Sequence, residues 1–149
     1  MVKGPGDIVS MLDLFRSELE RHSLALERGL VSVGTCEERI VQLVRAAHSL
    51  RGAARIVQLD CAARLAQAME EVLAAGQKSE HRLGGAVVDS LRAANEVFRQ
   101  LVQYNAEEIP ARLDSRRDDV ERIIQKLGMP PVQRTESHTT PEPAAGPPS

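Results

Sequence analysis

The most informative stretch of the chain is AAHSLRGAAR, residues 46–55. It is rich in alanine, the best helix former, yet it carries Gly52, and glycine costs about 1 kcal/mol relative to alanine inside a helix. Side chains four residues apart lie on the same face of a helix. Gly52 therefore leaves open space beside the imidazole of His48. Such a gap suits a histidine that another protein must reach.

The composition of the whole chain favours helices. Of its 149 residues 42% are hydrophobic but only 2% are aromatic, so the core must consist of aliphatic side chains, which fits helix packing better than a sheet. A length of this order is enough for one domain with a core. Few aromatics and a net charge of −2 also argue against a nucleic-acid partner, which would attract a basic protein.

Several other classes are disfavoured. No apolar run approaches the ~20 residues of a membrane span, and the N-terminus lacks the apolar region of a secretory signal, so we expect no membrane insertion. Cys36 and Cys61 form no Cys-x-x-Cys pair and are expected to be free thiols in a reducing cytoplasm. The four histidines and two cysteines show no metal-ligand spacing, so no metal site is expected.

Apolar residues recur at helical spacing in five segments. The first helix is expected from Asp7, an N-cap residue, to about residue 31. Thr35 and Glu38 form a capping box for the second helix, and Asp60 caps a third that ends near Gly76. The expected inward positions are Leu12, Phe15, Leu19 and Leu26 in the first, Leu43, Ala47, Leu50 and Ala54 in the second, and Leu65, Met69 and Leu73 in the third.

Two more helices complete the expected domain. The fourth carries Leu91, Phe98 and Leu101 inward and is ended or interrupted at Ile109-Pro110. A last helix is expected to start at Asp114 or Ser115 and to stop at Gly128. No segment alternates as a strand does, so residues 1–128 are predicted to form an all-α antiparallel bundle. Residues 129–149 are rich in proline and are predicted to be a disordered linker.

Helical geometry places His48 outside the core. At about 100° per residue, His48 lies roughly 120° from the centre of the apolar stripe of its helix. Arg51 lies between that flank and the core edge, and Arg45 and Arg55 share the flank with His48. A neutral imidazole has a free lone pair and is a nucleophile. Guanidinium groups suit a phosphoryl group, whose oxygens their planar fork can bind.

The third helix offers a partner for the histidine. Glu70 falls at the edge of its apolar stripe, and Gln67 lies one turn earlier on the same flank. If the second and third helices form an antiparallel hairpin, Glu70 can approach His48, fix its tautomer and leave the other ring nitrogen free to attack. The neighbouring Glu71 is an alternative carboxylate, and Glu70 itself can be an ordinary solvated residue.

The run His48-Ser49-Leu50-Arg51-Gly52-Ala53-Ala54 resembles the histidine-phosphotransfer (HPt) motif. Residues 45–57, followed by Ala68-Met69-Glu70-Glu71, are similar to the N-terminal HPt domain of chemotaxis-type histidine kinases, and within these to the Wsp-like hybrid kinases. The opening segment, residues 12–20, is similar to the first helix of those domains. The resemblance covers about residues 7–128 in architecture and is specific in its motif over residues 45–71.

The resemblance implies a four-helix bundle of HPt type with an additional C-terminal helix. It implies that His48 accepts a phosphoryl group from ATP through a separate kinase domain and passes it to a receiver-domain aspartate, within chemotaxis-like two-component signalling. Arg51 and Glu70 would support the imidazole and the phosphoryl group, while Gln67 stands where these kinases often carry a second histidine. No cofactor is expected in this domain, because the partner domains bind ATP and Mg²⁺.

Two alternatives remain open at the level of sequence. The chain can be a non-catalytic helical interaction module whose small apolar patch binds a partner. It can also be a stand-alone carrier, although the Pro-rich end favours a cytoplasmic fragment of a sensor histidine kinase. An autonomous kinase is disfavoured, because the chain has no Gly-rich phosphate-binding loop and no carboxylate cluster for Mg²⁺.

Overall fold

The computed structural model describes residues 5–31, 37–79 and 84–128 of the chain. These residues form six α-helices and one short 3₁₀-helix, and within these ranges there is no strand. The elements are α1 (Pro5–Val31), α2 (Glu37–Ile56), α3 (Asp60–Ser79), α4 (Gly85–Leu101), the 3₁₀-helix η2 (Ala106–Glu108), α5 (Ile109–Ser115) and α6 (Arg117–Gly128). The predicted all-α class is confirmed.

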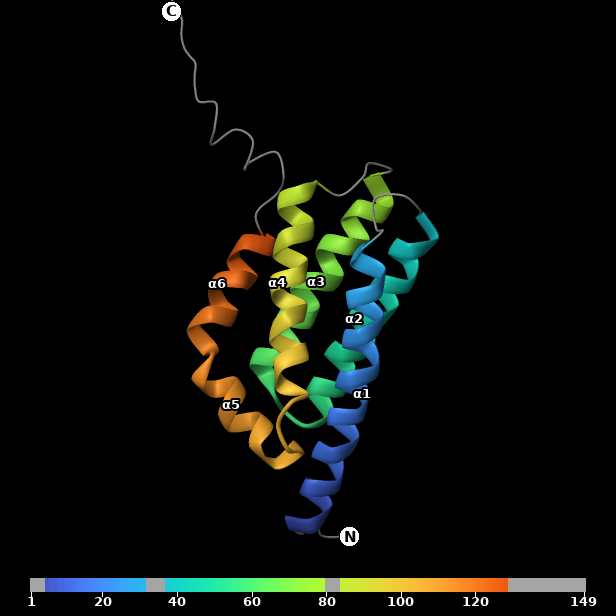
Figure 1. Ribbon diagram of the computed structural model, residues 1–149. Helices are drawn as coiled ribbons and strands as arrows, with labels where there is room; N and C mark the ends of the chain where they lie inside the picture. The colour runs from blue at the N-terminus through green and yellow to red at the C-terminus, as the bar shows by residue number, and fades with distance from the viewer. Residues whose placement is uncertain (1–4, 32–36, 80–83, 129–149) are drawn as a thin grey trace, which may run out of the picture.

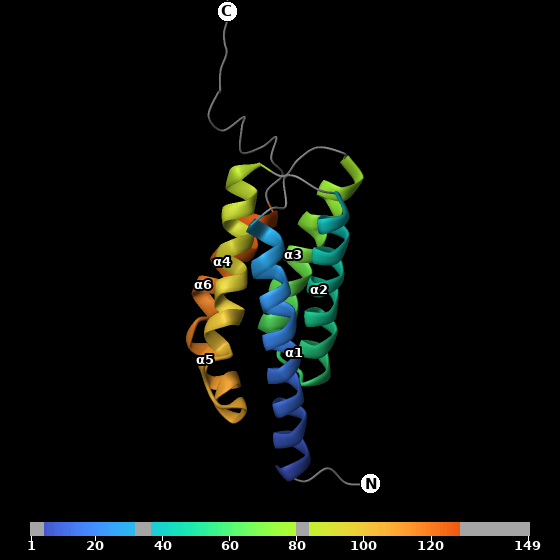
Figure 2. The same cartoon turned by 45° about the vertical axis from the view of Figure 1, so that its right-hand side comes forward.

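The four long helices alternate in direction along one bundle (Figures 1 and 2). α2 packs against both α1 and α3, and its pairing with α3 is the most extensive in the described part of the chain. α4 packs against α1, and α6 returns along the bundle against α3 and α4. This arrangement confirms the predicted antiparallel four-helix bundle with an additional C-terminal helix.

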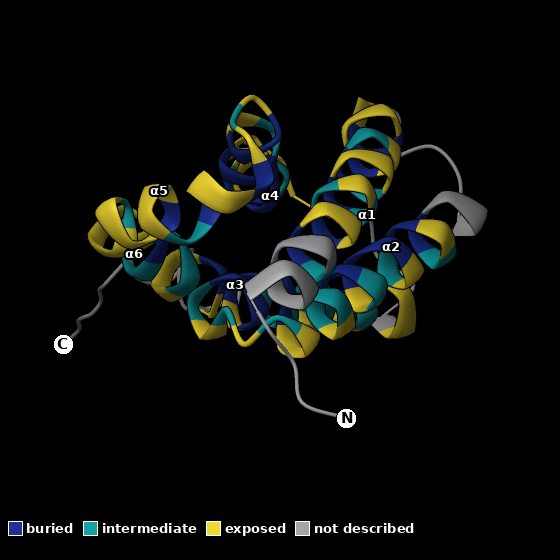
Figure 3. Cartoon of the chain, turned by 90° about the horizontal axis from the view of Figure 1, so that it is seen from below, coloured by how far each residue is buried: buried dark blue, intermediate teal, exposed yellow. Residues whose placement is uncertain are grey.

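The core follows the helical spacing of the apolar side chains. Buried residues face the inside of the bundle and exposed ones face outwards (Figure 3). Fully burying one leucine or methionine contributes about 1.5–3 kcal/mol, so this shared interior holds the helices together. Its largest fully buried side chains are Phe98, Leu19, Leu26, Leu30, Leu43, Leu50, Leu65, Met69, Leu73, Leu91, Leu101 and Ile109.

Two predicted helix ends are wrong. α1 begins at Pro5 instead of Asp7, because proline is favoured in the first helical turn, where its missing N–H has no helical partner. α3 continues past Gly76 to Ser79, because a single glycine weakens a helix without ending it. The positive charge of Lys78 in the last turn also interacts favourably with the helix dipole. The predicted capping box at Thr35 and the predicted linker 129–149 lie outside the described residues.

The region around Pro110 also differs from the prediction. The fourth helix already ends at Leu101, well before Ile109-Pro110, and Pro110 occupies the first turn of an additional short helix, α5. The last helix, α6, begins at Arg117 and not at Asp114 or Ser115. Ser115 instead belongs to the end of α5, where its hydroxyl donates to the Arg112 carbonyl at 2.7 Å. Asp114 accepts from Arg117 at 2.8 Å across the junction between α5 and α6.

A tight turn joins α2 to α3. Gln58 has a φ of 60°, in the left-handed region that usually favours glycine. The Leu59 N–H donates to the Ala54 carbonyl at 2.9 Å and the Gln58 N–H to the Arg55 carbonyl at 3.0 Å. This pair of bonds is the Schellman motif, which satisfies the free carbonyls at a helix C-terminus. The motif reverses the chain within three residues and thereby fixes α2 and α3 as a hairpin.

Polar contacts tie α1 to the C-terminal half of α4. The Arg16 guanidinium donates to the carbonyls of Tyr104 at 2.8 Å and Val102 at 2.6 Å, beyond the end of α4. Nearer the middle of the helices, the buried Asn95 amide donates to the Ser23 carbonyl at 2.9 Å. Unpaired polar groups are costly in a core, so these bonds help to specify how α1 and α4 pack.

Two helical glycines predict opposite effects of substitution. A Cβ at Gly29 would overlap Cδ2 of the buried Leu43 and lie 3.1 Å from its Cγ, whereas a Cβ at Gly52 meets nothing within 4 Å. We expect Gly29→Ala to lower the free energy of unfolding by about 1–2 kcal/mol through overpacking. The matched control Gly52→Ala should raise it by up to about 1 kcal/mol through helix propensity. Urea denaturation measures both, and equal stability of the two variants would contradict the close α1–α2 approach.

Candidate functional site

His48 projects from the middle of α2 into solvent. Its neighbours Ala47 and Leu50 are buried at 0% and 1% exposure, whereas the His48 side chain is 61% exposed. The helical phase that packs Leu50 into the core therefore directs the imidazole outwards, as predicted from the spacing. A partner has direct access to the ring.

Glu70 of α3 is hydrogen-bonded to one nitrogen of this ring. Its Oε2 lies 2.9 Å from His48 Nδ1, and its side chain is only 17% exposed. A carboxylate can only accept a hydrogen bond, so Nδ1 carries the proton and donates it. In the neutral ring, Nε2 then holds the lone pair. The predicted pairing of His48 with Glu70 is present, and it directs the nucleophilic nitrogen away from the carboxylate.

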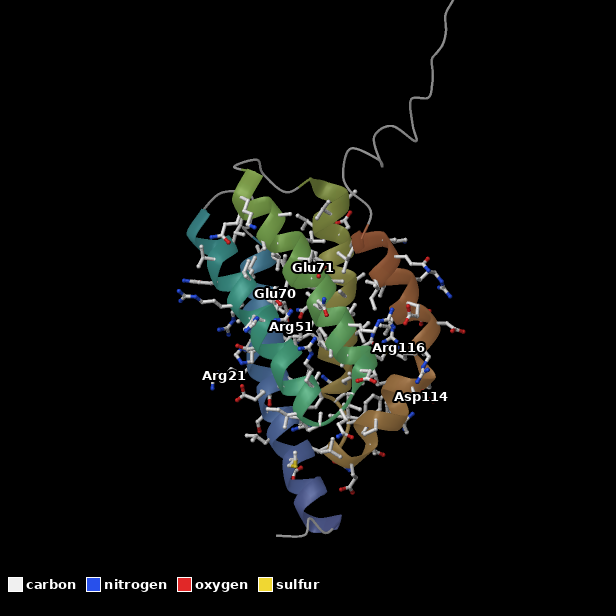
Figure 4. All side chains as sticks on the ribbon, turned by 180° about the vertical axis from the view of Figure 1, so that it is seen from behind. Arg21, Arg51, Glu70, Glu71, Asp114 and Arg116 are labelled. Carbon is white, nitrogen blue, oxygen red and sulfur yellow. The ribbon has the colours of Figure 1, made fainter. Side chains whose placement is uncertain are left out.

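Arg51 completes a three-residue cluster between α2 and α3 (Figure 4 labels Arg51 and Glu70). Its Nη1 lies 3.2 Å from the buried Glu70 Oε1, and its Nη2 lies 3.2 Å from His48 Nδ1. Guanidinium nitrogens only donate, and Nδ1 already donates to Glu70, so the second contact is a close approach and not a hydrogen bond. Arg51 therefore pairs with the carboxylate and keeps its remaining N–H groups beside the ring.

Gly52 borders the cluster on the exposed side of α2. It is exposed, and no other side chain would touch a Cβ at this position. Packing among the described residues thus gives no reason for a glycine in the helix. The clearance that it provides lies on the outside, where a second molecule would approach His48.

Gln67 is directed to a different neighbour. Its amide donates to Glu71 Oε2 at 3.1 Å, one turn further along α3. Glu70 and not Glu71 is therefore the carboxylate at the histidine, which resolves the alternative left open by the sequence. A role for Gln67 in phosphoryl transfer stays a prediction.

Other titratable groups lie apart from this cluster. His22 pairs with Glu18 Oε1 at 3.0 Å on α1, where its side chain is largely shielded from solvent. Burial raises the pKa of the Cys61 thiol, which lies on the face of α3 towards α6. On that face Arg64 forms a bidentate pair with Glu121, and its hydrogen bond lowers the pKa of the Glu121 carboxyl.

The described residues contain neither a cluster suited to a metal ion nor a segment suited to crossing a membrane. No group of three or more His, Cys, Asp or Glu side chains in residues 5–31, 37–79 and 84–128 is arranged to hold a metal ion. Over the same ranges, no helix combines the length and the apolar character needed to cross a membrane.

His48 is exposed and oriented by a carboxylate, and a guanidinium and an open gap lie beside it. These features are chemically suited to carrying a phosphoryl group on the ring. Comparison with known families matches residues 10–104, more than half of the chain, to the Hpt domain. The chain therefore belongs to the Hpt domain family, whose function is histidine phosphotransfer in two-component phosphorelays. Searches of curated proteins and of solved structures gave no match.

We expect Glu70→Gln to weaken control of the His48 tautomer. A neutral amide can either accept from Nδ1 or donate to it, so the preference for a proton on Nδ1 is reduced. Long-range ¹H–¹⁵N NMR of the ring at pH 8 should show protonated Nδ1 in the wild type and a mixture in the variant. Glu71→Gln is the matched control and should leave the spectrum unchanged. A wild-type spectrum with the proton on Nε2 would contradict the assignment.

Proposed function

We propose that His48 accepts the γ-phosphoryl group of ATP from a separate kinase domain and passes it to a receiver-domain aspartate. The observation that carries the proposal is the 2.9 Å contact between His48 Nδ1 and Glu70 Oε2, because it leaves Nε2 as the free nucleophile on an exposed ring. The membership of the Hpt family supports histidine as the carrier of the phosphoryl group.

In the first step, His48 Nε2 attacks the γ-phosphorus. The N–P bond forms as the bond between this phosphorus and the bridging oxygen breaks, and the electron pair leaves with ADP. Positive charge develops on the imidazole, and the Glu70 carboxylate beside the Nδ1 proton stabilises it. Arg51, whose Nη2 lies 3.2 Å from Nδ1, adds positive charge beside the ring, which favours the approach of the anionic phosphoryl group.

In the second step, a receiver carboxylate oxygen attacks the same phosphorus. The N–P bond breaks and its electron pair returns to Nε2, which regenerates the starting tautomer. Most catalysis of phosphoryl transfer is positioning and charge stabilisation. On this proposal the kinase domain supplies ATP with its Mg²⁺ and the receiver supplies its own Mg²⁺ and aspartate, so this chain provides the nucleophile, its orientation and the access.

The resemblance to chemotaxis-type kinases extends the proposal to the cellular setting. We infer that the chain acts in the cytoplasm as the HPt part of a Wsp-like hybrid kinase and is not an autonomous enzyme. A non-catalytic interaction module is the second candidate, because an exposed helical face can bind a partner without any chemistry. The Glu70 contact favours the first candidate, since simple binding does not require an oriented imidazole.

Replacing the nucleophile separates these two candidates. The domain is mixed with Mg²⁺, labelled ATP and a chemotaxis-type kinase core, and an acid-labile, base-stable phosphoryl label is measured. His48→Gln should abolish the label, because His48 is the one histidine of the described residues that is both exposed and held by a carboxylate through Nδ1. His22→Gln is the control and should be labelled as the wild type is. Equal labelling of His48→Gln would contradict the assignment of the nucleophile, and an unlabelled wild type would favour the interaction module.

Filling the gap at Gly52 should reduce transfer without unfolding the bundle. We expect Gly52→Gln to slow phosphorylation at least ~10-fold, because a long side chain at this position obstructs the approach of a partner. Helical circular dichroism should stay close to that of the wild type, since no described residue packs against a side chain at Gly52. A normal transfer rate would contradict the importance of the clearance.

A further inference from the structure

Most arginines of the described residues contact another polar group or an aromatic ring, but two exposed arginines on the helix of His48 do not. Nine of the thirteen described arginines contact a carboxylate, a side-chain or backbone oxygen or an aromatic ring, as Arg64 does with Glu121 and Arg16 with backbone carbonyls. Those with no such contact to another described residue are Arg28, Arg45, Arg55 and Arg92. Two of these four, Arg45 and Arg55, lie on α2 on either side of His48 along the helix, and both are exposed.

Helical phase places these two arginines on one flank of α2. At about 100° per residue, Arg45, Gly52, Arg55 and Ile56 all fall within roughly 80° of His48. Arg45, Gly52 and Ile56 lie to one side of His48, whereas Arg55 lies about 20° to the other side. Arg51 lies about 60° to that second side, towards α3, where it is half-buried and contacts Glu70. We call the exposed set Arg45, His48, Gly52, Arg55 and Ile56 the α2 flank. It is basic and open, whereas the α3 side of His48 is occupied by a carboxylate.

The outer end of this flank also exposes an apolar side chain. Ile56 is 66% exposed, although burying an isoleucine contributes about 1.5–3 kcal/mol. It follows Arg55 directly and is the last residue of α2. An exposed charge beside an exposed aliphatic side chain is typical of a surface that another protein covers.

Arg55 and Ile56, at the C-terminal end of α2, lie some distance from His48 Nε2, the reacting atom. Helices rise about 1.5 Å per residue, so Arg55 lies about 10 Å along the axis from His48. A phosphoryl group on Nε2 is much smaller than this separation. The backbone of Arg55 and Ile56 therefore lies beyond the reacting atom, where the surface of an approaching partner would extend.

We propose that Arg55 and Ile56, together with Arg45, dock the receiver domain that takes the phosphoryl group from His48. This inference rests on the proposed function and names the part of the site that binds the acceptor. A receiver that uses an aspartate and Mg²⁺ must gather carboxylates around its acceptor, because carboxylate oxygens are the ligands that Mg²⁺ prefers. Its face is therefore acidic, which complements Arg45 and Arg55, two arginines without a partner among the described residues.

The test measures transfer to the receiver separately from loading. The domain is phosphorylated chemically with phosphoramidate, which needs no kinase, and is mixed with Mg²⁺-loaded receiver domains from the source genome. The receiver that takes the phosphoryl group fastest is chosen for the comparison. At low salt, Arg55→Glu should raise the concentration of this receiver that gives half the maximal transfer rate about fivefold or more. The maximal rate should not change, and the difference should shrink at about 0.5 M salt, where the Debye length is only a few ångströms. Ile56→Ser should raise the same concentration at both salt levels.

Matched variants on other faces serve as controls. Arg92→Glu makes the same charge change on α4, and Val31→Ser removes an equally exposed aliphatic side chain, 73% exposed, at the end of α1. Both should transfer as the wild type does, and Arg55→Lys should retain most of the affinity because it keeps the charge. An Arg55→Glu variant that saturates like Arg92→Glu would overturn the proposal.

Two further outcomes are distinguishable. If Arg55→Glu slows loading by the kinase core but not transfer to the receiver, the flank docks the kinase and the proposal is wrong. If the wild type accepts label from neither phosphoramidate nor the kinase, or passes it to no receiver, the proposed function itself fails. Circular dichroism of each variant verifies that the bundle is intact.

Discussion

The hairpin formed by α2 and α3 is the constraint on which the rest of the site depends. Its turn leaves Gln58 in the left-handed region and satisfies two carbonyls of α2, so the chain reverses within three residues. His48 lies eleven residues before Leu59 and Glu70 lies eleven after it. Equal arms on the two helices bring these side chains to the same height, which places Nδ1 within 2.9 Å of Oε2. A different turn length would shift this register and separate the acid from the ring.

The same hairpin divides the surroundings of His48 into two unlike sides. Towards α3, Glu70 and Arg51 are partly shielded from solvent and hold one ring nitrogen. Away from α3, Gly52 and the exposed arginines leave the other side open. Orientation and accessibility often conflict, because packing that holds a side chain also covers it. Here Glu70 of α3 orients the His48 ring, and Gly52 of α2 keeps the ring accessible.

Much of the fold was predictable because helical packing leaves a strong local pattern. Burial of apolar side chains with a period of 3.6 residues placed α1 to α4 and the inward positions such as Leu19, Leu50 and Leu91. Helix ends were less predictable. Gly76 resembles a stop signal but lies within α3, and Pro110 resembles a break but starts α5. Whether a glycine ends a helix, or a proline begins one, depends on the backbone hydrogen bonds of the adjacent helical turns. The spacing of apolar residues does not show these bonds.

The sequence by itself determined the helical class, the exposure of His48 and the presence of a basic, uncrowded flank, because each of these follows from angles along a single helix. It also placed Glu70 near the edge of the next helix. Only the tertiary structure decided that Glu70 and not Glu71 meets the ring, that Gln67 is bonded elsewhere and that Arg51 is shared with the carboxylate. These outcomes depend on the register between two helices. That register is fixed by a turn at Val57-Gln58-Leu59, which contains no glycine or proline to mark it in the sequence.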